Sequence, residues 1–152
     1  MPANTMHAVV ATGYGGPEVY QYREVSKPQP KENEVLIRVH ASSVTAADTM
    51  IRTGTPYFGR LFIGLRTPKH PIPGTGFAGV VETTGKSVNQ FKPGDRVFGE
   101  TTLGFSTNAE FVTVPGTGVI LPMPEGMSFE EGATFTDGPL TSYNFLKEIG
   151  QI

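Results

Sequence analysis

The segment 71–99, PIPGTGFAGVVETTGKSVNQFKPGDRVFG, carries the clearest fold signal in the chain. Two stretches rich in β-branched and aromatic residues, Phe77–Thr83 and Arg96–Glu100, have the composition of β-strands. Turn-forming residues lie between them, at Gly85 and at 93–95 (Pro-Gly-Asp). This part of the chain is therefore predicted to consist of short strands joined by turns.

The same alternation continues downstream of this segment. Strand signals recur at Ala109–Val114 and Val119–Leu121, with turn signals at Gly104 and at 115–116 (Pro-Gly). Short strands at such regular spacing are typical of a β-barrel or a β-sandwich. The chain is therefore predicted to be mainly β.

Three strands are also expected upstream of the segment. Met6–Ala11 and Val19–Val25 flank the glycine-rich stretch 13–17, which predicts a hairpin. The strongest strand signal is Val35–Ala41, whose centre is apolar on both faces. Because such a strand has both faces covered, we expect it to lie in the interior of a sheet.

Helices are predicted at three places. Apolar residues at helical spacing predict a short helix over Ala46–Thr53, ended by Gly54. Ser128 and Glu131 form a capping-box pattern that starts a second helix, and the stretch 137–139 (Asp-Gly-Pro) starts a third. The third helix has apolar residues on more than one side, which predicts a partner surface for it.

Length and composition exclude several classes of protein. The chain has 152 residues, which is the size of one domain, and no cysteine, so disulfides, cysteine zinc sites and thiol catalysis are excluded. The net charge of −2 provides no basic field for nucleic acid or an anionic membrane. No apolar run approaches the roughly 20 residues of a membrane span. The first five residues lack signal-peptide features and are predicted to be a flexible extension, so the expectation is a cytoplasmic protein.

The motif Gly74-Thr75-Gly76-Phe77-Ala78-Gly79 matches the dinucleotide-binding pattern G-x-G-x-x-G. In a dinucleotide site, these glycines follow a strand and open a helix. Here a proline-rich stretch, 70–73, precedes the motif, and strand-forming residues follow it. The glycines are therefore predicted to allow a turn and close backbone packing at the start of a strand.

Two other features are weighed as possible sites. The long stretch Thr55–Gly76 contains four prolines and the basic residues Arg60, Arg66 and Lys69, and a solvated loop is favoured over a phosphate-binding patch. The three histidines lack the spacing of metal ligands. His40, within a strand signal, is interpreted as structural. The residues alone therefore predict no active site.

Several stretches together resemble one enzyme family. Asp48, Arg52 and Gly54 fill the pattern D-x-x-x-R-x-G that follows a strand in that family. The resembling stretches are 6–17, 35–54, 71–99, 109–115 and 128–146. They resemble the zinc-free medium-chain dehydrogenases/reductases, and among these the quinone-oxidoreductase-like enzymes.

The resemblance implies a fold and a division into parts. The fold is a GroES-like, partly open β-barrel with a short helix after the third strand and two helices at the C-terminal end. Residues 6–127 are expected to form the catalytic domain, after an extension over residues 1–5. Residues 128–152 are expected to be a helical lead-in to a Rossmann domain that this chain does not contain.

The resemblance also implies an activity. The complete enzyme transfers hydride from NADPH or NADH to a quinone or an α,β-unsaturated carbonyl, with the nicotinamide in a cleft between two domains. It is expected to be a cytoplasmic homodimer, and the isolated chain is expected to be inactive. Zinc is not expected, because Thr45 stands where zinc-dependent relatives have cysteine, and 75–76 (Thr-Gly) replaces their His-Glu pair.

Four residues are carried over as candidates for the site. Thr45 is expected to be catalytic and to contact the nicotinamide amide, with helix capping as the alternative. Asp48 is a second catalytic candidate, although stabilising the first helical turn is favoured. Tyr57 is a substrate-binding candidate, with a simple surface aromatic as the alternative. Thr141 is a cofactor-binding candidate that could instead bond to its own helix.

The sequence departs from the family pattern at three places. Thr45-Ala46 replaces asparagine-proline, Gly76 replaces an aspartate, and the stretch 105–109 lacks a double glycine. Two alternatives therefore stay open. One is a stand-alone GroES-like binding or oligomerisation module that uses its terminal helix as an interface. The other is a zinc enzyme that has lost its ligands.

Overall fold

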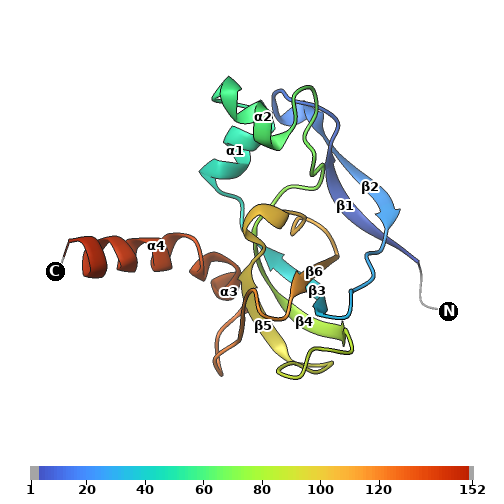
Figure 1. Ribbon diagram of the computed structural model, residues 1–152, viewed down its shortest axis with the longest axis vertical. Helices are drawn as coiled ribbons and strands as arrows, with labels where there is room; N and C mark the ends of the chain where they lie inside the picture. The colour runs from blue at the N-terminus through green and yellow to red at the C-terminus, as the bar shows by residue number, and fades with distance from the viewer. Residues whose placement is uncertain (1–3, 151–152) are drawn as a thin grey trace.

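The main body of the protein is a curled, five-stranded antiparallel sheet. The computed structural model describes residues 4–150. The order of the strands is β6-β3-β4-β5-β7, and Figure 1 shows the sheet wrapping into a partly open barrel. Their bounds are β3 (Glu34–Ser42), β4 (Gly76–Thr84), β5 (Arg96–Glu100), β6 (Phe111–Pro115) and β7 (Val119–Pro122). The predicted mainly β fold is confirmed.

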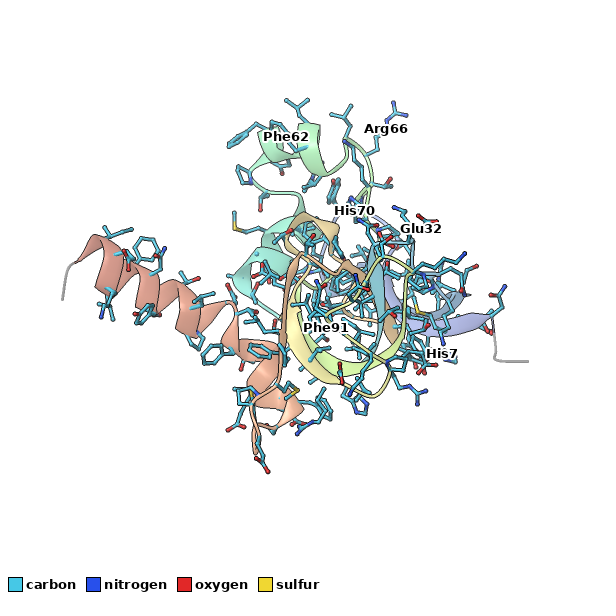
Figure 2. All side chains as sticks on the ribbon, turned by 60° about the horizontal axis from the view of Figure 1, so that its bottom comes forward. His7, Glu32, Phe62, Arg66, His70 and Phe91 are labelled. Carbon is cyan, nitrogen blue, oxygen red and sulfur yellow. The ribbon has the colours of Figure 1, made fainter. Side chains whose placement is uncertain are left out.

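β3 lies in the interior of this sheet, as predicted. It pairs with β4 on one side and with β6 on the other. Val35 and Ile37 are fully buried, and Phe91 lies within the curl of the sheet in Figure 2. The main core consists of Val35, Ile37, Phe77, Val81, Phe91, Val97, Val112, Val114 and Ile120. Burial of these side chains is the main stabilising contribution to the barrel.

The predicted N-terminal hairpin forms a separate two-stranded sheet of β1 (Thr5–Ala11) and β2 (Tyr20–Ser26), with the 3₁₀ turn η1 (Pro17–Val19) between them. The hairpin joins the barrel through β1, because Ala8 bridges to Ala109. Residues 1–3 of the predicted extension lie outside the described residues, and Thr5 is the first residue of β1.

Two short helices follow β3. α1 (Ala46–Thr53) has the predicted bounds and ends at Gly54, whose φ of +63° is readily adopted by glycine. The stretch predicted as an irregular loop contains the 3₁₀ turn η2 (Tyr57–Gly59) and α2 (Arg60–Ile63). Figure 2 shows Phe62 and Arg66 on this segment, at its end away from the sheet.

The C-terminal helices differ in how they pack. α3 (Phe129–Phe135) starts at the predicted capping box and packs against β3, β4 and β5, with Ala133 buried against the sheet. α4 (Gly138–Asn144) continues into the π-helical turn η4 (Phe145–Ile149), and Figure 1 shows both projecting away from the barrel. Their large apolar side chains are exposed, at Leu140, Tyr143, Phe145, Leu146 and Ile149.

The glycines of the G-x-G-x-x-G motif serve close packing, as predicted. A β-carbon on Gly79 would clash with the backbone oxygen of Arg38 on the neighbouring strand. A β-carbon on Gly76 would clash with the hydroxyl of Ser43 and would lie 2.7 Å from the backbone oxygen of Ala133. The motif therefore begins β4, and its glycines allow β3 and α3 to approach β4 closely.

Between residues 4 and 150, no helix is both long enough and apolar enough to span a lipid bilayer.

Candidate active site at the start of α1

Asp48 connects the start of α1 to the loop before β4. The residue is only 4% exposed. Oδ2 accepts hydrogen bonds from the backbone N–H of Thr45 at 2.8 Å and from the Thr45 hydroxyl at 3.3 Å. Oδ1 accepts from the backbone N–H of Gly74 at 3.1 Å. Asp48 therefore fixes the position of Thr45, and both of its oxygens are used within the protein.

Thr45 lies on a cavity of about 430 Å³ between the start of α1 and the α3–α4 junction. We call this space the Thr45 cavity. It is lined by Ser43, Val44, Thr45, Ala46, Thr134, Asp137, Gly138 and Pro139. Its volume lies in the range of about 300–1,000 Å³ that is usual for small-molecule sites.

Ser43 contributes an unused hydroxyl at this cavity. The residue is only 6% exposed, and Oγ has no hydrogen-bond partner among the described residues. The absent side chain of Gly76 leaves room for that hydroxyl. Buried polar groups are nearly always hydrogen-bonded, and the hydroxyls of Thr107 and Thr136 share this unpaired state among the described residues.

Two carboxylates lie near the same end of the sheet. Asp137 lines the Thr45 cavity at the start of α4, and Glu100 is the last residue of β5. Burial raises the pKa of Glu100 above its ordinary value, and the negative charge of Asp137 adds to the effect. Of the two, only Asp137 lines the Thr45 cavity.

A second, larger cavity of about 620 Å³ lies between the hairpin and β3. We call it the hairpin cavity. His7 and Tyr22 stack on its wall with their rings 5.0 Å apart, and Asp48 also lines it. Burial, reinforced by Asp48, raises the pKa of Tyr20, while Arg52 partly opposes the shift. His40 and Glu110 also line this cavity, so it holds several groups that can take part in acid–base chemistry.

The structure brings together two of the four predicted site residues. Thr45 and Asp48 are hydrogen-bonded to each other. Tyr57 is 73% exposed, lies on neither cavity, and has the guanidinium of Arg60 4.8 Å from its ring centre. Thr141 is exposed on α4, and its backbone N–H donates to the Asp137 carbonyl at 3.2 Å. The roles assigned to all four stay predictions.

Sequence reasoning missed three residues of this region, namely Ser43, Glu100 and Asp137. The sequence predicts Asp137 only as a helix start and Glu100 only as the end of a strand, and it assigns Ser43 to no element. Their proximity depends on the register of β4 with β5 and on the packing of α3, which no sequence pattern specifies. A strand-terminal glutamate and an aspartate at a helix start are weak signals individually.

The described residues contain no cluster of three or more histidine, cysteine, aspartate or glutamate side chains that could hold a metal ion. His40 stacks on Phe129 with ring centres 4.3 Å apart, as a structural histidine would. The side chains around Thr45 therefore offer hydroxyls and carboxylates rather than a set of nitrogen and sulfur ligands.

Comparison with known proteins agrees with this fold. Residues 31–125, which are most of the chain, match the family described as the alcohol dehydrogenase GroES-like domain. The chain belongs to this family. The predicted resemblance to quinone-oxidoreductase-like medium-chain dehydrogenases/reductases is confirmed.

Among curated proteins, the human quinone oxidoreductase is 36% identical to this GroES-like domain over 143 residues. The alignment covers 93% of this chain and 40% of the human protein. The chain thus spans less than half the length of that relative.

Two solved structures extend the comparison. The human synaptic vesicle membrane protein VAT-1 homolog-like protein superposes with a TM-score of 0.86 at 32% identity, covering 99% of this chain and 45% of its own. A mycobacterial protein solved in complex with NADPH superposes with a TM-score of 0.79 at 29% identity, covering 97% of this chain and 42% of its own. Both solved structures share the fold of this chain over nearly its whole length.

Proposed function

We propose that this chain is the substrate-side domain of an NAD(P)H-dependent oxidoreductase that reduces quinones or α,β-unsaturated carbonyls. The observation that carries the proposal is the Thr45 cavity, which Ser43 and Thr45 line in a GroES-like domain. The relative solved with NADPH and the quinone oxidoreductase relatives support the choice of cofactor and substrate. When bound, NAD(P)H supplies the hydride.

The two hydroxyls fit a primary carboxamide such as that of nicotinamide. The Thr45 hydroxyl donates its hydrogen to Asp48, so its lone pairs are left to accept from an amide N–H. The Ser43 hydroxyl has no partner among residues 4–150 and can donate to an amide oxygen. One acceptor and one donor match the donor and acceptor of a carboxamide, so Thr45 and Ser43 would orient the ring.

Asp48 acts through Thr45 in this proposal. Because its carboxylate accepts the Thr45 hydrogen, it sets the direction in which the hydroxyl accepts. Because it also holds Gly74, it keeps the loop before β4 against α1. Asp48 is thus a positioning residue, whereas Thr45 contacts the cofactor.

The remaining parts of the proposal concern the longer enzyme. Residues 6–127 form its catalytic domain, and residues 128–152 lead to a dinucleotide-binding domain outside this chain. The relative lengths of the chain and of human quinone oxidoreductase support such a second domain. Thr141 contacts the cofactor and Tyr57 the substrate once that domain is in place. The enzyme is zinc-free, homodimeric and cytoplasmic in this proposal, and the isolated chain is inactive.

A second candidate function is a stand-alone oligomerisation module. The exposed apolar side chains of α4 and η4 favour it, because such surfaces usually have a partner. Sedimentation of the 152-residue chain separates the two functions. A discrete dimer or ring would favour the module, whereas a monomer agrees with a domain whose partner surface belongs to the longer enzyme.

The function is tested on the complete gene product that contains this chain. We expect it to oxidise NADPH in the presence of a quinone or an enone, with Thr45→Val and Ser43→Ala each raising the NADPH KM. Ser87→Ala, on an exposed turn, is the control and should leave both constants unchanged. A complete gene product that binds no NADPH would refute the proposal. Saturable micromolar binding of NADPH to the isolated chain would refute the two-domain part of it.

A further inference from the structure

The stretch that contains η2, α2 and the loop after them, residues 57–69, presents large apolar side chains to solvent. We call it the α2 segment. Its five exposed apolar residues are 66–76% accessible, namely Tyr57, Phe58, Leu61, Phe62 and Leu65. Tyr57 and Leu61 are four residues apart, so they lie on one side of the helical turns, and the same spacing places Phe58 beside Phe62. An exposed apolar cluster of this kind usually has a partner.

Arg60 fastens the α2 segment to the rest of the protein. Its guanidinium donates to the carbonyl oxygens of Gly54 at 3.0 Å and Thr53 at 3.1 Å, and it lies 4.3 Å from the ring centre of Tyr14. The Tyr14 hydroxyl in turn donates to the carbonyl oxygen of Gly64. The segment is therefore held by polar contacts to α1 and the hairpin, while its apolar side chains stay in solvent.

Arg66 and Lys69 add positive charge beside these apolar side chains. They line a hollow of about 640 Å³ together with Leu61 and Leu65. Both are exposed, and neither takes part in an ion pair among residues 4–150. The loop that carries them is closed by a hydrogen bond from the backbone N–H of Lys69 to the carbonyl oxygen of Ile63 at 2.7 Å. One hollow thus combines apolar walls with two cations that no acid neutralises.

The charges in this part of the sequence have one sign. Residues 49–81 contain no aspartate or glutamate, and their basic residues are Arg52, Arg60, Arg66 and Lys69. The net charge of −2 for the whole chain, which provides no overall basic field, therefore conceals a locally basic stretch. Figure 2 shows Arg66 at the same end of the molecule as Phe62, so charge and apolar surface occur together.

We propose that the α2 segment is a docking surface for an anionic lipid bilayer. Apolar and aromatic side chains next to basic ones are the combination with which a short segment lies in the interface of such a bilayer. Phe58, Leu61 and Phe62 enter the boundary of the acyl chains, and Arg66 and Lys69 contact the headgroup phosphates. This inference goes beyond the proposed reductase function and does not depend on it.

The first test is sedimentation of the complete gene product with vesicles made of equal parts of phosphatidylglycerol and phosphatidylcholine. We expect binding that high salt weakens and that pure phosphatidylcholine vesicles do not support, because it requires anionic headgroups. Arg66→Glu should weaken binding about fivefold or more, and Phe62→Ser about tenfold or more.

Two variants outside the α2 segment are the matched controls of this test. Lys86→Glu, on an exposed turn, makes the same change of charge as Lys69→Glu, and Tyr22→Ser removes an aromatic ring that is 72% exposed on the hairpin. Both should bind the anionic vesicles as the wild type does. The proposal is wrong if the wild type binds neither kind of vesicle, or if Arg66→Glu and Phe62→Ser bind as well as the controls. Thermal melting of each variant separates lost binding from lost folding.

The second test uses the absence of tryptophan from the 152-residue chain. Phe62→Trp places one fluorophore on the α2 segment, and Tyr22→Trp places one on the hairpin. Figure 2 shows Phe62 far from His7, on which Tyr22 stacks. With anionic vesicles that contain brominated lipid, fluorescence should be quenched in Phe62→Trp and not in Tyr22→Trp. Equal quenching in the two variants, or none in Phe62→Trp, contradicts docking through this segment.

Two further outcomes would assign the same surface to another occupant. If Phe62→Ser converts a dimeric gene product into a monomer and leaves vesicle binding unchanged, the surface is an interface between copies of the protein. If the 152-residue chain binds anionic vesicles and the complete gene product does not, another part of the gene product covers the surface. Either result overturns the lipid proposal. Neither measurement involves NADPH oxidation, so such a failure leaves the proposed reductase function unaffected.

Discussion

The barrel and the C-terminal helix α4 form a sharp contrast within one chain. The centre of β3 is buried completely, whereas every residue of α4 is exposed. Both segments are rich in apolar residues. The barrel buries its apolar side chains among neighbouring strands and α3, whereas the apolar side chains of α4 are exposed. Stability of the isolated chain should therefore depend on the barrel and hardly at all on α4.

The largest expected change in the free energy of unfolding comes from removing a large side chain from the core of the barrel. Phe77 is fully buried, so Phe77→Ala should lower the free energy of unfolding by about 3–5 kcal/mol through lost burial and a residual cavity. Leu146→Ala on the exposed helical extension should change it by less than about 0.5 kcal/mol. Urea unfolding of both variants measures the difference. Similar losses in the two would mean that α4 packs against the barrel in solution.

Two glycines give a matched pair with opposite expected signs. Gly79→Ala forces a β-carbon against the Arg38 backbone and should destabilise by about 1–3 kcal/mol. Gly138→Ala, in the first turn of α4, has open space around it and should be neutral or stabilising by up to about 1 kcal/mol. Thermal melting tests both. A neutral Gly79→Ala would contradict the close approach of β3 and β4.

The buried acid Asp48 and the exposed acid Glu148 of η4 should contribute differently to the stability of the fold. Asp48→Asn replaces one accepting oxygen by a donor, which leaves Thr45 or Gly74 without a partner, and should cost about 1–3 kcal/mol. Glu148→Gln loses no bond among the described residues and should have no measurable effect. The midpoint of urea unfolding for each variant checks this. Equal midpoints would show that the buried hydrogen bonds of Asp48 do not stabilise the fold.

The smallest expected effect is a dependence of barrel stability on pH. Hydrogen bonds from Arg38 and Lys27 lower the pKa of Glu82 in the folded protein. A lowered pKa means that the ionised acid stabilises the fold at neutral pH, and that this contribution is lost as the pH falls through the folded-state pKa. Glu82→Gln should therefore be less stable than the wild-type chain at pH 7. Its stability should also fall less steeply than that of the wild type as the pH drops towards 3.

Melting curves of Glu82→Gln and the wild-type chain across this pH range measure the effect, with Glu148→Gln as the control on α4. Because Glu82 is partly exposed, solvent screens the ion pair and the expected contribution is at most about 1 kcal/mol. Parallel curves for the wild type and Glu82→Gln would exclude a contribution from this acid.

The barrel could be predicted from the sequence because its signals are local. Strand composition, turn residues and the capping box at Ser128 fix the elements, and the apolar centre of Val35–Ala41 places that strand in the interior. Helix bounds at Ala46–Thr53 follow from apolar spacing and Gly54 for the same reason.

The site could be predicted only in part, because its members are joined by tertiary contacts. Thr45 and Asp48 are three residues apart in one capping arrangement, so one local pattern contains both. Ser43 and Asp137 line one cavity because of the packing of α3, which depends on the whole fold. Residue types alone could not show that Ser43 is buried without a partner.

The central claim is that this domain holds a substrate for hydride transfer from a nicotinamide. The most direct measurement follows deuterium from NADPH labelled at C4 into the product of an enone, using the complete gene product and mass spectrometry. With NADPH labelled at C4 in H₂O, we expect one deuterium on the β-carbon of the product. With unlabelled NADPH in D₂O, we expect the deuterium at the neighbouring α-carbon instead. A reduced product that carries deuterium only from solvent would contradict direct hydride transfer and with it the proposed function.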